Sequence, residues 1–158
     1  MAEVVTYREL WREAFERLNR EWIETWFELE AADRETFRDP YGKIVAPGGQ
    51  IFFVVEGDEV LGTCAVVRHG PATHEIAKMA VAPAARGLGY GDLLMEAAVE
   101  FSRAAGARRV VIVSNTRLAP AIRLYEKHGF VRVPLEPDER YARADIRLEL
   151  ELGRQPVR

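Results

Sequence analysis

The chain contains a single cysteine, Cys64, so it can form no internal disulfide. That usage fits a reducing compartment, and we expect a cytoplasmic protein. The first residues lack the apolar stretch of a signal peptide, and no run approaches the roughly 20 apolar residues of a membrane span. The three histidines stand at no metal-ligand spacing. With one cysteine beside them, we expect no zinc or other metal site.

An excess of charge of one sign is also absent. The formal net charge is −3 and the basic residues are dispersed, so neither a nucleic-acid surface nor a membrane partner is predicted. The 158 residues are 48% hydrophobic and 30% charged, which is the balance of a globular domain with a real core. We expect a single domain over residues 1–152 and a flexible C-terminal tail over residues 153–158.

The periodicity of the apolar residues predicts an α/β domain. Its middle strand–helix–strand unit is a parallel crossover, and strands before and after it add antiparallel neighbours. The sheet is therefore mixed and mostly antiparallel, twisted, with six or seven strands and helices on both faces. In chain order we expect a strand at 4–5, a long helix from a Thr6–Glu9 capping box to about Trp26, a short helix near 33–37, a hairpin of 51–55 and 60–67, a strand at 76–81, a helix at 89–105, a strand at 110–113, a helix at 118–128, and strands at 131–133 and 146–152.

The most informative motif is the turn Arg-Gly-Leu-Gly-Tyr-Gly at residues 86–91, between a buried strand and a strongly helical run. Such a turn leaves backbone N–H groups at the positive end of a helix dipole, which suits a pyrophosphate. Gly87, Gly89 and Gly91 remove side chains that would block close approach. The alternative is a glycine-rich connection that binds nothing.

Two other phosphate-binding motifs do not fit this turn. A dinucleotide-binding unit needs Gly-x-Gly-x-x-Gly and an acidic residue about 20 residues further on. Here the spacing is Gly-x-Gly-x-Gly, the unit follows a hairpin in mid-chain, and residues 108–111 are Arg-Arg-Val-Val. A nucleoside-triphosphate P-loop is excluded because the Gly-Lys-Ser/Thr ending is missing.

The stretch HEIAKMAVAPAARGLGYGDLLMEAA (74–98), followed by NTRLAPAIRLYEKHGF (115–130), resembles the GNAT superfamily of acyl-CoA-dependent N-acyltransferases. The resemblance implies acetyl-CoA as co-substrate, with its pyrophosphate on the glycine-rich turn and its pantetheine arm beside the preceding strand, between two splayed parallel strands. The cofactor-binding residues that it implies are Met79, Ala80, Val81, Arg86, Gly87, Leu88, Gly89, Tyr90, Gly91, Asn115 and Tyr125.

Two catalytic residues are implied. Tyr125 matches the family's helix tyrosine, and a neutral phenol can donate a proton to a departing thiolate; a core aromatic is the alternative. Glu75 matches a catalytic glutamate of some members and could accept the proton of the attacking amine. Strand alternation predicts that Glu75 shares a face with Met79 and Val81. The alternatives for Glu75 are a solvated carboxylate and a water relay.

Asn115 and residues 141–145 each allow two interpretations. Asn115 could bond the pantetheine amides, but many relatives place their asparagine at the position of Leu118, so a strand end or a helix cap is the alternative. Residues 141–145 are interpreted as a polar entry to the last strand, with lining of an acceptor groove as the other possibility.

We therefore predict an N-acetyltransferase that moves an acetyl group from acetyl-CoA to a primary amine by direct attack. The acceptor is a small-molecule or peptide amine, and the family often forms homodimers. A non-catalytic acyl-CoA-binding regulatory module is the alternative. Binding of a partner protein through the tryptophan-bearing first helix is a third hypothesis, although core or groove lining is the expected role of those tryptophans.

Overall fold

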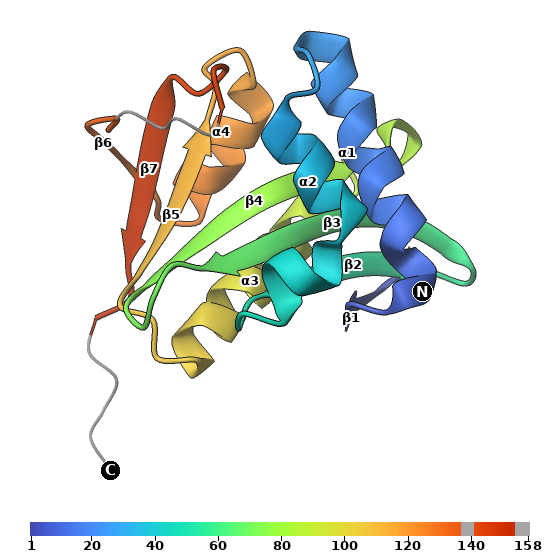
Figure 1. The fold of residues 1–158 in the computed structure, drawn as a ribbon, viewed down its shortest axis with the longest axis horizontal. Coiled ribbons are helices and arrows are strands. Elements are labelled where there is room, and N and C mark those ends of the chain that lie inside the picture. Colours follow the sequence, from blue (N-terminus) through green and yellow to red (C-terminus); the bar gives the residue numbers. More distant parts are fainter. Residues whose placement is uncertain (137–140, 154–158) are drawn as a thin grey trace.

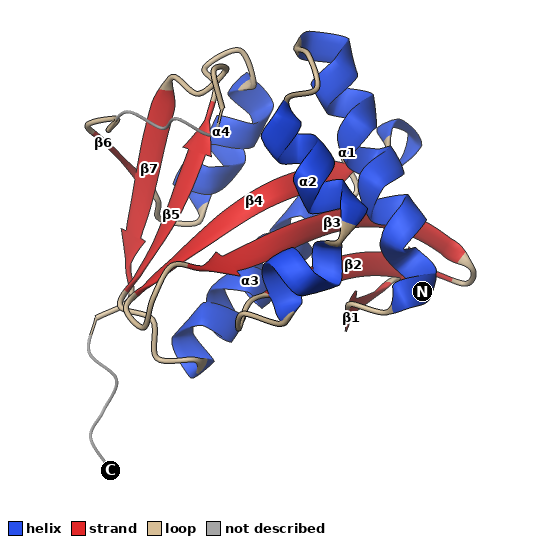
Figure 2. Ribbon diagram, viewed as in Figure 1, coloured by secondary structure: helices blue, strands red, loops and turns tan. Residues whose placement is uncertain are grey.

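The computed structural model describes residues 1–136 and 141–153, and they form a seven-stranded sheet with the order β1-β2-β3-β4-β5-β7-β6 (Figures 1 and 2). Only β4 and β5 are parallel; the other neighbouring strands are antiparallel. The strands are β1 Glu3–Thr6, β2 Gln50–Glu56, β3 Glu59–Arg68, β4 Thr73–Val81, β5 Arg109–Ser114, β6 Val131–Val133 and β7 Ile146–Glu151, and the α-helices are α1 Arg12–Trp26, α2 Ala31–Arg38, α3 Tyr90–Ala104 and α4 Ala119–Lys127.

Helices cover both faces of the sheet, which confirms the predicted fold class. α1 and α2 lie over one face in Figure 1, and α3 and α4 lie behind it. The central residues of β2 are apolar on both sides of the sheet, so both faces must be buried under helices. Phe53 packs in the cluster on the α1/α2 face, and Phe52 packs in the cluster on the α3/α4 face.

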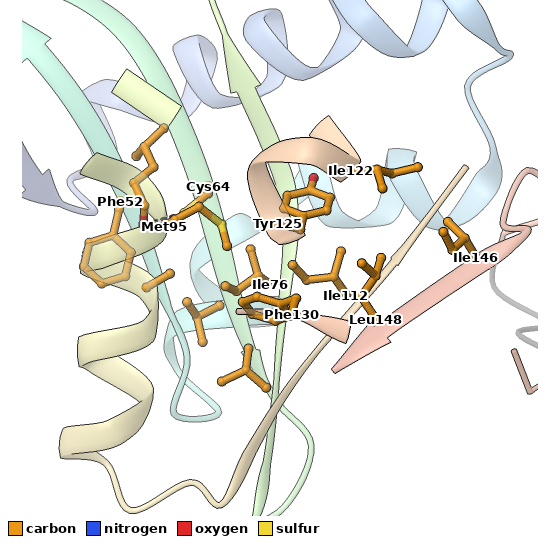
Figure 3. Close-up of a cluster of buried hydrophobic side chains, with 14 of the residues drawn as sticks. Phe52, Cys64, Ile76, Met95, Ile112, Ile122, Tyr125, Phe130, Ile146 and Leu148 are labelled. Atoms are coloured by element: carbon orange, nitrogen blue, oxygen red, sulfur yellow. Dashed lines mark hydrogen bonds between the residues drawn. The ribbon is translucent and has the colours of Figure 1, made fainter. Parts of the chain in front are cut away.

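The larger core cluster lies between the sheet and the α3/α4 layer (Figure 3). Leu94, Met95 and Ala98 come from one face of α3, at the three- and four-residue spacing of a buried helical stripe. Ile122 and Tyr125 come from α4 at the same spacing. This packing fixes both helices against the strands that surround the gap described next.

The sheet opens between its two parallel strands. β4 and β5 pair only at Thr73–Arg109, His74–Val110 and Glu75–Val111. Beyond Glu75 the six remaining residues of β4 have no strand partner on that side within the described part of the chain, and Figure 1 shows the two strands diverging. The divergence that the resemblance implies is therefore present, and it leaves unpaired backbone groups along one edge of β4.

β4 contains a bulge that breaks its alternation. Ala80 lies opposite Thr63 and Ala77 lies opposite Ala65, so Lys78 and Met79 together face a single residue of β3. After the bulge Met79 and Val81 turn to the α3/α4 cluster.

The prediction that Glu75 shares a face with Met79 and Val81 is wrong for this reason. Glu75 pairs with Val67, which packs on the α1/α2 face. The extra residue in the strand moves every later side chain to the opposite side.

The start of α1 also differs from the prediction. Glu9–Trp11 form a short 3-10 helix, α1 begins at Arg12, and no side chain caps it. A capping box is found instead at α2. Its N-cap residue is Glu30, and the Asp33 carboxylate accepts a hydrogen bond from the Glu30 N–H at 2.9 Å.

Three further expectations concern the C-terminal tail, membrane spans and metal sites. The predicted tail at 153–158 lies outside them except for Gly153. None of the helices within 1–136 and 141–153 is both long and apolar enough to cross a membrane. The same part of the chain holds no group of three or more His, Cys, Asp or Glu side chains that could bind a metal ion.

Candidate active site

A cavity of about 520 Å³ occupies the wedge between β4 and β5. Its walls come from β4, the turn before α3, the end of β5, α4, the end of α1 and the segment before β7. Every site residue predicted from the sequence lines it except Leu88, whose side chain points to solvent with an exposed fraction of 63%. The structure thus brings the predicted residues together around one space.

The glycine-rich turn forms one end of this cavity, and its surface is main chain. Gly87 and Gly89 have φ angles of +82° and +84°, a region that side chains disfavour, and a Cβ at either would meet nothing within 4 Å. Within the described residues, none of the backbone N–H groups from Gly87 to Asp92 has a hydrogen-bond acceptor. These groups precede and open α3, so they combine free donors with the positive end of the helix dipole.

Gly91 has a different role from the other two glycines. A Cβ on Gly91 would lie 2.9 Å from Cδ2 of Leu124. Its missing side chain therefore allows α4 to pack closely against the start of α3.

Two side chains of the turn point away from the bare amides. Arg86 forms an ion pair of 3.1 Å with Glu21 of α1. The Tyr90 hydroxyl lies 3.5 Å from the Glu56 carboxylate at the end of β2. Both contacts tie the turn to neighbouring elements and leave its N–H groups uncovered.

Tyr125 lies in the wall between this end and the middle of the cavity. It is 7% exposed and belongs to the core cluster, and Figure 3 shows its hydroxyl at the edge of that cluster, pointing away from Phe130. Burial, with a smaller contribution from Cys64, raises the pKa of the Tyr125 phenol above its usual range. The phenol is therefore a neutral proton donor at pH 7. Tyr125 is thus both a member of the core cluster and a residue of the cavity wall.

Glu75 lines the cavity near the point where β4 and β5 separate, on the α1/α2 face. Its side chain is only 6% exposed, so the solvated carboxylate considered from the sequence does not describe it. Glu75 Oε1 lies 2.6 Å from Nε2 of His69, whose side chain is 40% exposed. A buried carboxylate is thus joined to an imidazole at the surface.

Asn115 follows β5 and has both ends of its amide engaged. The side-chain amide donates to the Arg143 carbonyl at 2.6 Å, and its oxygen accepts from the Arg117 N–H at 2.8 Å. Asn115 lines the cavity, yet these bonds hold the strand end and the segment before β7 together.

Comparison with known proteins identifies the family. Residues 7–130 match the acetyltransferase (GNAT) family. The chain belongs to this family. A mycothiol acetyltransferase of Corynebacterium glutamicum strain R is 36% identical over 80 residues, which is 51% of this chain and 27% of that protein. A mycothiol acetyltransferase of Corynebacterium efficiens is 32% identical over 114 residues, 72% of this chain and 32% of that protein.

Solved structures agree on the fold. A GNAT acetyltransferase from Staphylococcus aureus Mu50 superposes with a TM-score of 0.88 at 14% identity, covering 97% of this chain and 100% of that one. A phosphinothricin acetyltransferase from Sinorhizobium meliloti, solved in complex with acetyl-CoA, gives 0.77 at 17% identity, covering 96% and 89%. The chain spans about a third or less of the length of the mycothiol acetyltransferases that it matches.

The far end of the GNAT cavity holds a charged cluster that the sequence did not predict. Asp33 of α2 is fully buried and accepts from Lys78 Nζ at 2.5 Å and from both terminal nitrogens of Arg143 at 2.7 and 2.8 Å. Burial alone would raise the pKa of the Asp33 carboxyl, but the bonds from Arg143 and Lys78 outweigh it and lower that pKa to about 2. No local pattern in the sequence announces a contact between residues so far apart.

Aromatic side chains complete the far end. Trp22, Trp26 and Phe27 line the cavity from the end of α1, and Tyr141 lines it from the opposite side. Trp26 is 53% exposed, and Arg143 lies over the Trp22 ring at 5.7 Å from its centroid. Two of the tryptophans thus line the groove, as predicted. Tyr141, Arg143 and Ala144 line it too, so the structure supports the groove-lining interpretation of that segment.

Proposed function

We propose that this GNAT domain transfers an acetyl group from acetyl-CoA to a primary amine by direct attack. One observation carries the proposal. A single cavity holds free backbone N–H groups at one end, the neutral phenol of Tyr125 in its wall, and the buried carboxylate of Glu75 near the vertex of the wedge. These are an anion site, a proton donor and a proton acceptor, which are the groups that acyl transfer to an amine requires.

The cofactor end fits a diphosphate and an extended amide-bearing arm. The N–H groups from Gly87 to Asp92 would bind the pyrophosphate of acetyl-CoA, because they are free, adjacent and at a helix N-terminus. The unpaired edge of β4 beyond Glu75 would bind the pantetheine amides as an added strand does. We expect Met79, Ala80 and Val81 to supply these backbone contacts.

The residues of the wedge then account for each proton. An amine with a pKa of about 10 is mostly protonated at pH 7, so Glu75 would accept a proton from the ammonium group before attack. The nitrogen forms a bond to the acyl carbon, and a backbone N–H near Met79 would stabilise the oxyanion. The carbon–sulfur bond then breaks, and Tyr125 would give its proton to the thiolate. The nitrogen, which is positively charged after attack, would lose its second proton to the Tyr125 phenolate, and this restores the phenol. His69, half exposed and bonded to Glu75, connects the carboxylate to solvent.

The acceptor that we propose is a small-molecule amine. The mycothiol acetyltransferases named above point to acceptors of this size, and the aromatic far end offers an apolar surface for such a molecule. It remains a prediction that the acceptor can be a peptide amine. The same holds for the formation of a homodimer and for a cytoplasmic location.

The test is the release of thiol from acetyl-CoA in the presence of a panel of small primary amines and peptides. We expect amine-dependent release with at least one acceptor, and product mass increased by one acetyl group. Tight binding of acetyl-CoA with no release for any amine would contradict the transferase and support the regulatory acyl-CoA-binding module instead.

A further inference from the structure

Lys78 has a backbone conformation that is unusual for a residue with a side chain. Its φ angle is +53°, and within 1–136 and 141–153 every other positive φ belongs to glycine. It occupies the first position of the β4 bulge, where Lys78 and Met79 face one residue of β3. Bulges with a left-handed residue at this position ordinarily use glycine, because a Cβ is disfavoured there. Something must hold a lysine in this conformation.

The side chain of Lys78 is anchored at its far end. Its Nζ donates to Asp33 Oδ1 at 2.5 Å and to the Tyr141 hydroxyl at 2.9 Å, and it lies 4.4 Å from the centroid of the Tyr141 ring. The side chains of Lys78 and Asp33 are 5% and 0% exposed. Asp33 is itself fixed by α2 and by the paired bonds from Arg143.

Within residues 1–136 and 141–153, this cluster joins two cations to two carboxylates. Lys78 and Arg143 are the cations, and Asp33 and Glu30 are the carboxylates, with Arg143 3.4 Å from Glu30. The contacts of the cluster connect α2, β4 and the segment before β7, so its geometric effect is to clamp the bulge.

The clamped bulge lies in the cavity wall. Ala77, Lys78 and Met79 all line the cavity, at a stretch of β4 that β5 has already left. A bulge leaves one of its peptide groups without a partner on the neighbouring strand. On the side of β4 that faces β5, these residues have no strand partner among the described residues, and the proposed mechanism takes the donor for the oxyanion from this edge.

We propose that Asp33 is a positioning residue that acts through Lys78. By anchoring the Lys78 ammonium, Asp33 holds the bulge in β4 and so aims the backbone N–H near Met79 at the carbonyl oxygen of the bound acyl group. The inference rests on the proposed function, because it needs an acyl thioester in the cavity.

The test compares Lys78→Ala with Lys78→Gly and needs no acceptor. Both substitutions remove the anchor and leave the Arg143 bonds of Asp33 available, so we expect both variants to fold. Alanine retains the Cβ that disfavours the left-handed conformation, whereas glycine adopts it freely. The affinities of acetyl-CoA and of CoA are measured by calorimetry for each variant, because only acetyl-CoA has the carbonyl that the N–H would bind.

We expect the wild-type protein to bind acetyl-CoA about fivefold more tightly than CoA, the difference expected for one hydrogen bond. Lys78→Ala and Asp33→Asn lose this preference, while Lys78→Gly and the double variant Asp33→Asn/Lys78→Gly keep it. Because the β4 edge is also proposed to bind the pantetheine arm, which acetyl-CoA and CoA share, the readout is the ratio of the two affinities within each variant.

The possible failures can be told apart. An equal preference in Lys78→Ala and Lys78→Gly, or no preference in the wild-type protein, would overturn the positioning role while leaving the proposed function in place. A wild-type protein that binds neither ligand would overturn the proposed function itself.

Discussion

The two ends of the cavity are built from different kinds of group. The proposed cofactor end is the main chain of six consecutive residues, Gly87 to Asp92, whose side chains are absent, exposed or bonded to other elements. The proposed acceptor end is made of side chains that meet from distant segments, with sequence separations of 45 residues for Lys78–Asp33 and 110 for Arg143–Asp33. A site made of main chain has a local sequence pattern, and a site made of distant side chains has none.

The largest expected effect breaks the cofactor end alone. Gly89→Glu places a side chain and a negative charge among the bare amides, and we expect CoA affinity to fall by at least about a thousandfold, since charge repulsion and steric exclusion act together. Calorimetry with CoA measures it.

A matched control lies at the other end of the same helix. Gly106 has a φ of +85°, close to the +84° of Gly89, and a Cβ there would also meet nothing within 4 Å. Gly106→Glu should therefore cost similar stability and leave the affinity for CoA within about twofold. Equal losses in the two variants would contradict a ligand site at the turn.

The next effect separates chemistry from cofactor binding. Glu75→Gln removes the proposed proton acceptor, and we expect turnover at pH 7 to fall about a hundredfold with acetyl-CoA affinity unchanged. Because the amine deprotonates itself as pH rises toward its own pKa, the defect should shrink between about pH 7 and pH 10. A pH profile of thiol release measures this defect. The control is Glu100→Gln, because Glu100 is an exposed residue of α3. A defect that is constant across that range would contradict the base.

The acceptor end can be tested through stability. The folded-state pKa of Asp33 is about 2, below its usual 3.8, so the carboxylate stabilises the fold at pH values above about 4. That stabilisation, about 2 kcal/mol or about thirtyfold in the folding equilibrium, is lost as pH falls from about 4 to about 2. Denaturant unfolding across that range should show a steeper decline for the wild-type protein than for Asp33→Asn. Parallel declines would contradict the buried ion cluster.

The smallest effect concerns the proton donor. Tyr125→Phe should lower turnover about tenfold and leave acetyl-CoA affinity unchanged. The effect on turnover is small because the thiol has a pKa of about 8.5, so its thiolate departs fairly easily without a proton donor. The matched control is Tyr41→Phe, since Tyr41 is 52% exposed and does not line the cavity. Equal turnover in the wild-type and Tyr125→Phe proteins would remove the acid role.

The same contrast explains how much could be predicted from the sequence. The order of elements, the divergence of β4 from β5 and the glycine-rich turn follow from local patterns or from the resemblance, and the structure bears out the fold. The prediction that Glu75 shares a side of β4 with Met79 and Val81 was wrong, because nothing in the sequence marks a lysine as the left-handed residue of a bulge.

The cluster around Asp33 was missed for a related reason. Asp33 falls in a short charged helix, and its partner Arg143 falls in a polar entry to a strand. Each alone looks like an exposed residue, and only the folded chain shows that they meet away from solvent.

The central claim is that bare amides at the start of α3 bind the diphosphate of coenzyme A. The direct measurement is a titration of ¹⁵N-labelled protein with CoA and, separately, with pantetheine, following the backbone amides of Gly87 to Asp92 by NMR. The account predicts large shifts of these amides with CoA and almost none with pantetheine, which lacks the diphosphate. Amides that stay unmoved at saturating CoA would contradict it.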